Sequence, residues 1–215
     1  MNYDRIYEYR FAGIGNEKKN QAWFEIAEFI YKKLDSPNKI LDPAAGFCEF
    51  INNVPSEEKW VIDLNEPFIN KYCKQNINKL IGNNLEVEIP ENYFDGIFVS
   101  NFLEHLYTQE QITLFLGRMY KTLKPGGKIA IMGPNFKYSY KNYFDFADHT
   151  MILTELSLAE HLYGANFFID KIYSQFLPIS FRGKLPLIPF LVKLYLRLPF
   201  FWKIFGKQFL LIGKK

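Results

Sequence analysis

The sequence predicts a single α/β domain in which a doubly wound, mostly parallel sheet of seven strands carries helices on both faces. Short apolar runs of strand length alternate along the chain with segments whose apolar residues recur at helical spacing. These helical segments are long enough to act as crossovers between parallel strands. A length of 215 residues, of which 48% are hydrophobic, suits one domain with one sizeable core.

The predicted elements follow one another in a regular order. A first helix is expected where apolar side chains recur between Trp23 and Leu34, and the DSPNK stretch ends it. A short strand is expected just before Gly82. The other strand-like runs are KILD (39–42), KWVID (59–63), FDGIFVS (94–100), GKIAIMG (127–133), FFIDKIY (167–173) and QFLLIG (208–213). Helical spacing fills most of the gaps between them.

Charge is distributed unevenly along the chain. Residues 182–215 hold eight Lys and Arg and no Asp or Glu, whereas the preceding 181 residues carry a net charge of about −5 (18 basic against 23 acidic groups). Two cysteines, Cys48 and Cys73, argue against a disulfide framework, and the start of the chain has no signal-peptide pattern. We therefore expect a cytoplasmic protein, and the acidic body disfavours binding to nucleic acid.

A ligand site is expected beyond the carboxyl ends of the strands, where doubly wound sheets bind their ligands. Asp42 ends the first strand, a turn with Ala44 and Gly46 follows, and Asp63 ends the second strand. An acid at that distance past the turn is placed to hold a ribose diol. Gly46 is the one glycine in a turn where a pyrophosphate loop needs several. The turn therefore favours an adenosine that carries an amino acid and no phosphate.

Four segments in order resemble the motifs of class I S-adenosylmethionine-dependent methyltransferases. They are LDPAAGFC, VIDLNEPF, NYFDGIFVSNFLEHL and LKPGGKIAIMGPN, within residues 38–135. The resemblance implies a Rossmann-like fold, S-adenosyl-L-methionine as the methyl donor and S-adenosyl-L-homocysteine as the product. The expected domain layout is an N-terminal cap and helix (1–37), a cofactor-binding core (38–135) and an acceptor-side region (136–215).

The resemblance also implies a set of cofactor contacts. Asp63 takes the ribose-binding position, with a generic strand-end acid as the alternative. Asn83 stands where an adenine contact is expected, although an Asn-rich turn explains it equally well. Cys48 is more plausibly a small packing residue than a nucleophile. The residues expected to contact the cofactor are Asp42, Ala44, Gly46, Asp63, Leu64, Asn83, Asn84, Ser100 and Asn101.

Methyl transfer to a hydroxyl or similarly weak acid requires a group that takes a proton, and histidine suits this role. His149 lies in YFDFADHT, on the loop where an acceptor would approach the methyl group, and Asp145 or Asp148 could orient its ring. The alternative is a cap cluster before the next helix. We expect His149 and Asp145 to be catalytic and no metal to take part. The residues expected to contact the acceptor are His105, Tyr138, Tyr140 and Lys141.

The C-terminal region predicts two short basic amphipathic helices within about residues 182–207, between the last two strands. They could lie on a membrane surface, on a partner or over the acceptor pocket. The pattern resembles methyltransferases of bacterial surface polysaccharide gene clusters. It implies a sugar, phosphate or phosphoramidate-bearing precursor, methylated on oxygen or nitrogen. The alternatives are a nucleic-acid or protein methyltransferase and an inactive adaptor with the same fold.

Overall fold

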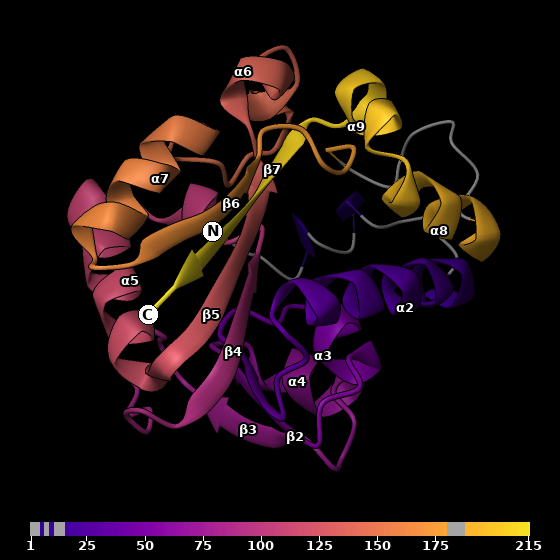
Figure 1. Ribbon diagram of the computed structural model, residues 1–215. Helices are drawn as coiled ribbons and strands as arrows, with labels where there is room; N and C mark the ends of the chain where they lie inside the picture. Colours follow the sequence, from indigo (N-terminus) through magenta and orange to yellow (C-terminus); the bar gives the residue numbers. More distant parts are fainter. Residues whose placement is uncertain (1–4, 7–8, 11–15, 180–187) are drawn as a thin grey trace.

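The strands of the protein form one seven-stranded sheet in the order β3-β2-β1-β4-β5-β7-β6 (Figure 1). The computed structural model describes residues 5–6, 9–10, 16–179 and 188–215. Strand β7 is antiparallel to both of its neighbours, and the other pairs are parallel. The strands are β1 (Lys39–Asp42), β2 (Glu58–Asp63), β3 (Asn78–Ile81), β4 (Phe94–Ser100), β5 (Leu123–Pro134), β6 (Phe168–Tyr173) and β7 (Gln208–Lys214).

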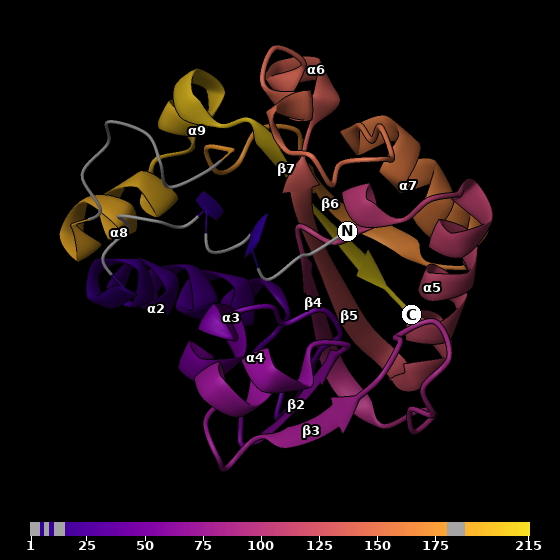
Figure 2. The ribbon, with the colours of Figure 1, turned by 180° about the vertical axis from the view of Figure 1, so that it is seen from behind.

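Helices cover both faces of this sheet, as Figures 1 and 2 show from opposite sides. Helices α2, α3, α8 and α9 contribute buried side chains to one core, and α5 and α7 contribute to the other. The helices are α2 (Asn16–Lys33), α3 (Glu49–Asn53), α4 (Glu66–Tyr72), α5 (Gln109–Thr122), α6 (Phe136–Ser139), α7 (Glu155–Gly164), α8 (Pro189–Arg197) and α9 (Pro199–Phe205). Single 3-10 turns lie at Leu103–His105 and Tyr143–Asp145.

The two cores follow from the alternation of side chains along each strand. In β1, Ile40 packs with the core under α2 and Leu41 with the core under α5. In β5, Ala130 packs with the core under α2 and Ile131 with the core under α5. Successive strand residues point to opposite faces, so a continuous apolar run is the pattern that a sheet covered on both sides requires. The predicted fold is therefore confirmed, including the strand before Gly82.

One detail of the fold departs from the predicted elements. Strand β5 begins at Leu123, four residues earlier than expected, because Leu123 pairs with Phe94 before the register shifts around the Gly126 turn. Helices α8 and α9 form as predicted between β6 and β7. Residues 182–187 of the predicted basic segment, and most of the predicted cap in residues 1–15, lie outside the described residues.

Candidate functional site

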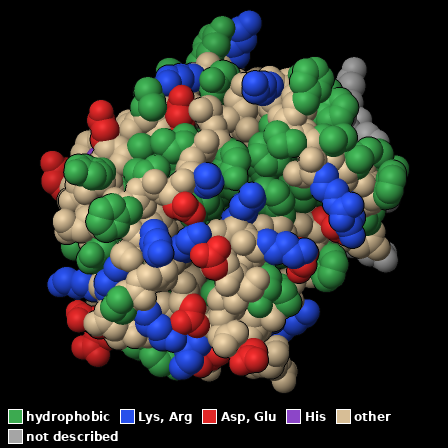
Figure 3. Space-filling model, in the orientation of Figure 1, with side chains coloured by type: hydrophobic (Ala, Val, Ile, Leu, Met, Phe, Trp, Pro, Cys, Tyr) green, Lys and Arg blue, Asp and Glu red, His purple; other side chains and the backbone are tan. Residues whose placement is uncertain are grey.

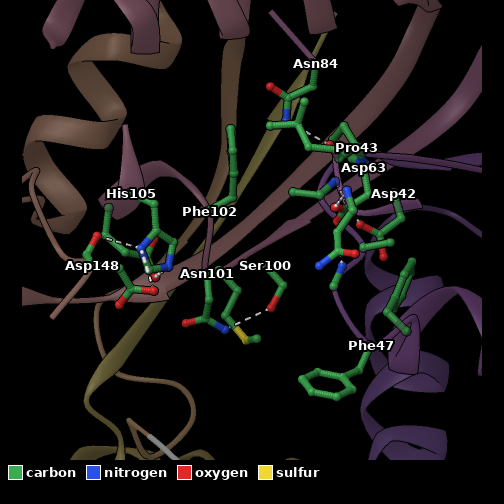
Figure 4. A pocket seen from close by; sticks show the side chains of 18 of the residues that line it. Asp42, Pro43, Phe47, Asp63, Asn84, Ser100, Asn101, Phe102, His105 and Asp148 are labelled. Atoms are coloured by element: carbon green, nitrogen blue, oxygen red, sulfur yellow. Dashed lines mark hydrogen bonds and ion pairs between the residues drawn. The ribbon is translucent and has the colours of Figure 1, made fainter. Parts of the chain in front are cut away.

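A cleft of about 1140 Å³ opens beyond the carboxyl ends of β1, β2, β4 and β5. Its position is the point where the strand order reverses between β1 and β4, which is where doubly wound sheets bind ligands. Polar side chains reach it from several strand ends, as Figure 4 shows for Asp42, Asp63 and Ser100. Its volume lies just above the usual range of about 300–1,000 Å³ for small-molecule pockets.

The turn between β1 and α3 is held in shape by two carboxylates. The Gly46 N–H donates to Asp63 Oδ2 at 3.0 Å, and the Ala44 N–H donates to Asp42 Oδ1 at 3.3 Å. Gly46 has φ 49°, a left-handed conformation that glycine adopts without a Cβ penalty. These bonds place Asp42, Ala44 and Gly46 on the cleft wall, as the sequence predicted.

Asp63 has its two carboxylate oxygens fixed by backbone amides from opposite sides. Besides the bond from Gly46, the Asn65 N–H donates to Asp63 Oδ1 at 2.9 Å. Burial raises the pKa of Asp63, and these amide bonds oppose that shift. Each carboxylate oxygen keeps a second lone pair, so the oriented group can still accept bonds from a ribose diol. The Leu64 side chain, 71% exposed, lies beside it on the cleft wall.

The two asparagines after β3 differ in what their side chains do. Asn83 Oδ1 accepts from the Leu85 N–H at 3.0 Å, and its amide donates to Glu86 at 3.1 Å. The side chain therefore closes an Asn turn at the cleft edge. Asn84 is buried, and its Nδ2 donates to the Pro43 carbonyl oxygen at 2.9 Å (Figure 4). Asn84 thus ties the turn after β3 to the turn after β1.

The end of β4 supplies the next part of the wall. Asn101 has φ 50°, and its N–H donates to the Met132 carbonyl oxygen at 2.9 Å. Its side-chain amide donates to Ser100 Oγ at 3.0 Å (Figure 4). Asparagine tolerates the left-handed conformation better than most residues. The predicted pair Ser100 and Asn101 therefore borders the cleft at its centre.

A polar cluster occupies the far end of the cleft. Glu104 and Asp148 are buried carboxylates, and Arg10 forms an ion pair with Asp148. His105 Nδ1 lies 2.9 Å from the Asp148 carbonyl oxygen and 3.6 Å from Asp148 Oδ2. Glu104, His105 and His149 offer ligand atoms within 4.8 Å of one another, a spacing at which they could also hold a metal ion.

His149 is the member of this cluster with an unused buried nitrogen. Its Nδ1 has no hydrogen-bond partner among the described residues. Burial, followed by the charge of His105, lowers the pKa of His149 to about 4. The ring stacks on Phe146, with centroids 4.8 Å apart, and meets Tyr143 edge-on at 4.7 Å. A neutral imidazole in a fixed orientation therefore faces the cleft.

The structure corrects four predicted site residues. Asp145 is exposed, lies outside the cleft lining and accepts a hydrogen bond from Asn142 at 3.1 Å, so it does not orient His149. Tyr138 and Tyr140 are also surface residues outside the lining, and the Lys141 amine lies over the Tyr140 ring. The predictions for Tyr138, Tyr140 and Lys141 are wrong because these residues lie in or just after the short helix α6, which leads the chain away from the strand ends. His105, by contrast, lines the cleft as predicted.

Two buried acids of the site were missed or left as alternatives. Asp148, the other acid named as a candidate to orient His149, lines the cleft and pairs with Arg10 and His105. Glu104 precedes His105 in the LEH segment, and burial raises its pKa. Cys48 is fully buried in the core, in agreement with a packing role. A hydrogen bond with the Cys73 thiol, followed by burial, raises the pKa of the Cys48 thiol, and both cysteines are free.

Comparison with known protein families gives a match for the central part of the chain. Residues 41–131 match the family described as "Methyltransferase domain". Among curated proteins no sequence matches the chain.

Solved structures resemble the whole chain. A SAM-dependent methyltransferase from Archaeoglobus fulgidus is similar with a TM-score of 0.70 and 21% identity, covering 100% of both chains. A possible histamine N-methyltransferase from Thermotoga maritima gives 0.66 and 14%, covering 99% of this chain and 96% of the other. The N-methyltransferase NodS from Bradyrhizobium japonicum, solved with S-adenosyl-L-homocysteine, gives 0.63 and 15%, with 96% and 91% covered.

The residues present suit this cofactor. The oriented Asp63 carboxylate meets the needs of a ribose, and the Asp42 carboxyl group offers a hydrogen-bond acceptor to a cofactor amine. The turn after β1 makes no provision for a pyrophosphate. Residues 41–131 thus match a methyltransferase domain, and the whole chain shares its fold with solved S-adenosylmethionine-dependent methyltransferases.

Proposed function

We propose that the enzyme transfers the methyl group to a hydroxyl or amino group of a small polar acceptor of the sugar type. The observation that carries this is the polar cluster at the far end of the cleft. Carboxylates and a neutral imidazole accept hydrogen bonds, and hydroxyl and amino groups donate them. Two solved neighbours are described as N-methyltransferases, so nitrogen stands beside oxygen as the methylated atom.

The charge at the far end of the cleft restricts which group of the acceptor can lie next to the methyl carbon. Glu104 and Asp148 place two buried carboxylates at this end of the cleft, and Arg10 pairs with Asp148. A phosphate next to them would meet like charge in a poorly solvated place. A precursor that bears a phosphate or phosphoramidate therefore fits best with that group away from the methyl carbon and a sugar hydroxyl or amine toward it.

His149 is proposed as the group that takes the proton. The sulfonium already activates the methyl carbon, so the enzyme has to align the acceptor, exclude water and accept a proton. With its pKa lowered to about 4, His149 is neutral at physiological pH and its lone pair is available. His105 and Asp148 pack beside it and fix the shape of the cluster.

The biological setting proposed is the synthesis of surface polysaccharide. Its support is the C-terminal sequence pattern, which is similar to that of methyltransferases from such gene clusters, together with an acceptor end suited to sugars. A nucleic-acid acceptor has less support because the first 181 residues are acidic overall.

Titration calorimetry with S-adenosyl-L-homocysteine tests the cofactor site. We expect micromolar binding that Asp63→Ala weakens by about tenfold or more, because a charged hydrogen bond is worth about 1.5–3 kcal/mol. The matched control is Asp145→Ala, which removes an acid outside the cleft and leaves the affinity unchanged. Absence of binding to the unaltered protein would support the inactive adaptor instead.

Mass spectrometry of reactions with nucleotide sugars, amino sugars and their free counterparts tests the acceptor class. We expect a methylated product from a member of this panel and none from duplex DNA. His149→Ala should keep cofactor binding and lose about 100-fold or more of the turnover, in line with the usual contribution of a general base. Full turnover in His149→Ala would remove the base assignment.

A further inference from the structure

Helices α8 and α9 present a large apolar surface to the outside of the molecule. Within residues 188–205 the exposed apolar side chains include Phe190 and Phe200, each 70% exposed. We call this set the apolar face; it consists of Ile188, Phe190, Leu191, Leu194, Leu198, Phe200, Phe201, Ile204 and Phe205. Figure 3 shows hydrophobic side chains gathered with Lys and Arg over this part of the molecule.

The opposite side of the two helices is firmly attached. Leu196 and Trp202 are buried in the core shared with α2. The indole Nε1 of Trp202 donates to the Tyr195 carbonyl oxygen at 2.8 Å, and the Tyr195 hydroxyl donates to the Phe176 carbonyl oxygen at 2.5 Å. The apolar face is thus held outward by a fixed anchor and has no covering element in the part of the chain that the structure describes.

The two helices that carry the apolar face also carry basic side chains and no acidic ones. Lys193, Arg197, Lys203 and Lys207 lie within residues 188–207, which contain no Asp or Glu. Lys193 Nζ lies 3.8 Å from Glu25 and remains 51% exposed. Among the described ion pairs, Arg197 and Lys203 have none. Exposed apolar groups beside cations without ion-pair partners suit a bilayer surface, where anionic headgroups cover an apolar interior.

The two helices are too short to cross a bilayer, so their length suits a position on its surface. Helices of nine and seven residues are far shorter than the hydrocarbon core requires. No helix among the described residues has the length and apolar character to cross a membrane. Pro199 separates α8 from α9 and lets them lie at an angle, so that apolar groups from both face outward.

We propose that α8 and α9 dock the enzyme on the surface of an anionic phospholipid bilayer. The apolar face enters the interface, and Lys193, Arg197 and Lys203 contact the headgroups, whereas the Lys207 amine donates to Asn142 Oδ1 at 3.0 Å. Docking sets the cleft close to the bilayer, since Leu177–Ile179 before the helices and Gln208 after them line the cleft. The proposal stands independently of the acceptor.

Co-sedimentation of the full chain with vesicles tests this docking. We expect binding to vesicles of phosphatidylcholine with phosphatidylglycerol, weaker binding to phosphatidylcholine alone, and a reduction in high salt as the charges are screened. The double variant Phe190→Ser/Phe200→Ser should bind about tenfold or more weakly, because each buried aromatic side chain contributes about 1.5–3 kcal/mol when fully transferred. Arg197→Gln/Lys203→Gln should lose the preference for anionic vesicles.

The matched control is Tyr163→Ser/Phe168→Ser, which removes two aromatic side chains of 73% and 71% exposure elsewhere on the surface. Retained binding of S-adenosyl-L-homocysteine shows that each variant is folded. Equal loss in both double variants, or no binding to anionic vesicles at low salt, would overturn the proposal. A dimer in light scattering that Phe190→Ser/Phe200→Ser dissociates, without vesicle binding, would assign the face to a second copy of the chain instead.

Discussion

At the scale of single residues, the protonation of His149 connects the geometry of the cluster to a measurable pH. Burial and the charge of His105 lower its pKa to about 4, and Arg10, Glu104 and Asp148 complete the charged surroundings. We expect the ring signals of His149, assigned by comparison with His149→Gln, to titrate in NMR spectra near pH 4. A midpoint near the ordinary value of about 6.5 would contradict the buried, unpaired ring.

The same shift affects stability in a definite direction. Between pH 6.5 and about 4 the unfolded chain binds a proton at His149 that the folded chain does not. The stabilising contribution of the neutral ring is therefore fully present above pH 6.5 and is lost as the pH falls toward 4. Urea unfolding should show a smaller loss over this interval for His149→Gln than for the unaltered chain.

A chelator distinguishes two uses of the Glu104, His105 and His149 cluster. A ring that takes the acceptor's proton needs a free lone pair, so turnover should survive exhaustive treatment with EDTA. Loss of turnover that Mn²⁺ or Zn²⁺ restores would show that these three residues hold a metal, as their spacing allows. That result would replace the base assignment of His149 with a ligand role.

The buried carboxyl group of Asp42 is expected to favour cofactor binding and to lower the stability of the fold at neutral pH. It is almost fully buried, and burial raises its pKa well above the usual range. Folding thus favours the protonated form, and the associated stability is lost as the pH rises through the folded pKa. At neutral pH, Asp42→Asn should raise the melting temperature while weakening S-adenosyl-L-homocysteine binding about tenfold. A variant with lower stability would contradict the burial penalty.

At the scale of elements, strands were predicted well because apolar runs report burial directly. The strand runs beginning at Lys39 and Phe94 could be recognised without knowledge of their neighbours. The acceptor loop was harder, since Asp145 and Asp148 are both acids near His149 in sequence. Which of them faces the cleft depends on a 3-10 turn at Tyr143–Asp145 and on the distant Arg10. Such long-range contacts leave no local pattern in the chain.

The junction between α9 and β7 depends on a glycine for reasons of space. A Cβ on Gly206 would lie 2.5 Å from the Trp202 carbonyl oxygen and 2.8 Å from the Phe176 nitrogen, both in the backbone. Gly206→Ala should therefore reduce the free energy of unfolding by about 1–3 kcal/mol and shift α9. Gly164→Ala, where a Cβ meets nothing within 4 Å, is the control, and urea unfolding measures both. Equal effects would argue against the steric explanation.

At the scale of the whole molecule, the cleft and the helices proposed to dock on lipid belong to parts of the chain with opposite net charge. The first 181 residues, which supply most of the cleft lining, are acidic overall, and the positive charge is concentrated in residues 182–215. A negative bilayer repels the first and attracts the second, so the charge distribution itself turns α8 and α9 toward the lipid. Because Phe190 and Phe200 lie outside the cleft lining, the two properties can be altered one at a time.

This separation predicts a double dissociation between variants. Phe190→Ser/Phe200→Ser should bind S-adenosyl-L-homocysteine with unchanged affinity in calorimetry and fail to sediment with anionic vesicles. Asp63→Ala should sediment normally and bind the cofactor product poorly, since Asp63 lines the cleft and no residue of α8 or α9 does. Loss of both properties in either variant would contradict this separation. It would show that the cleft and the apolar face depend on each other, with the buried Trp202 of α9 as the contact that connects them.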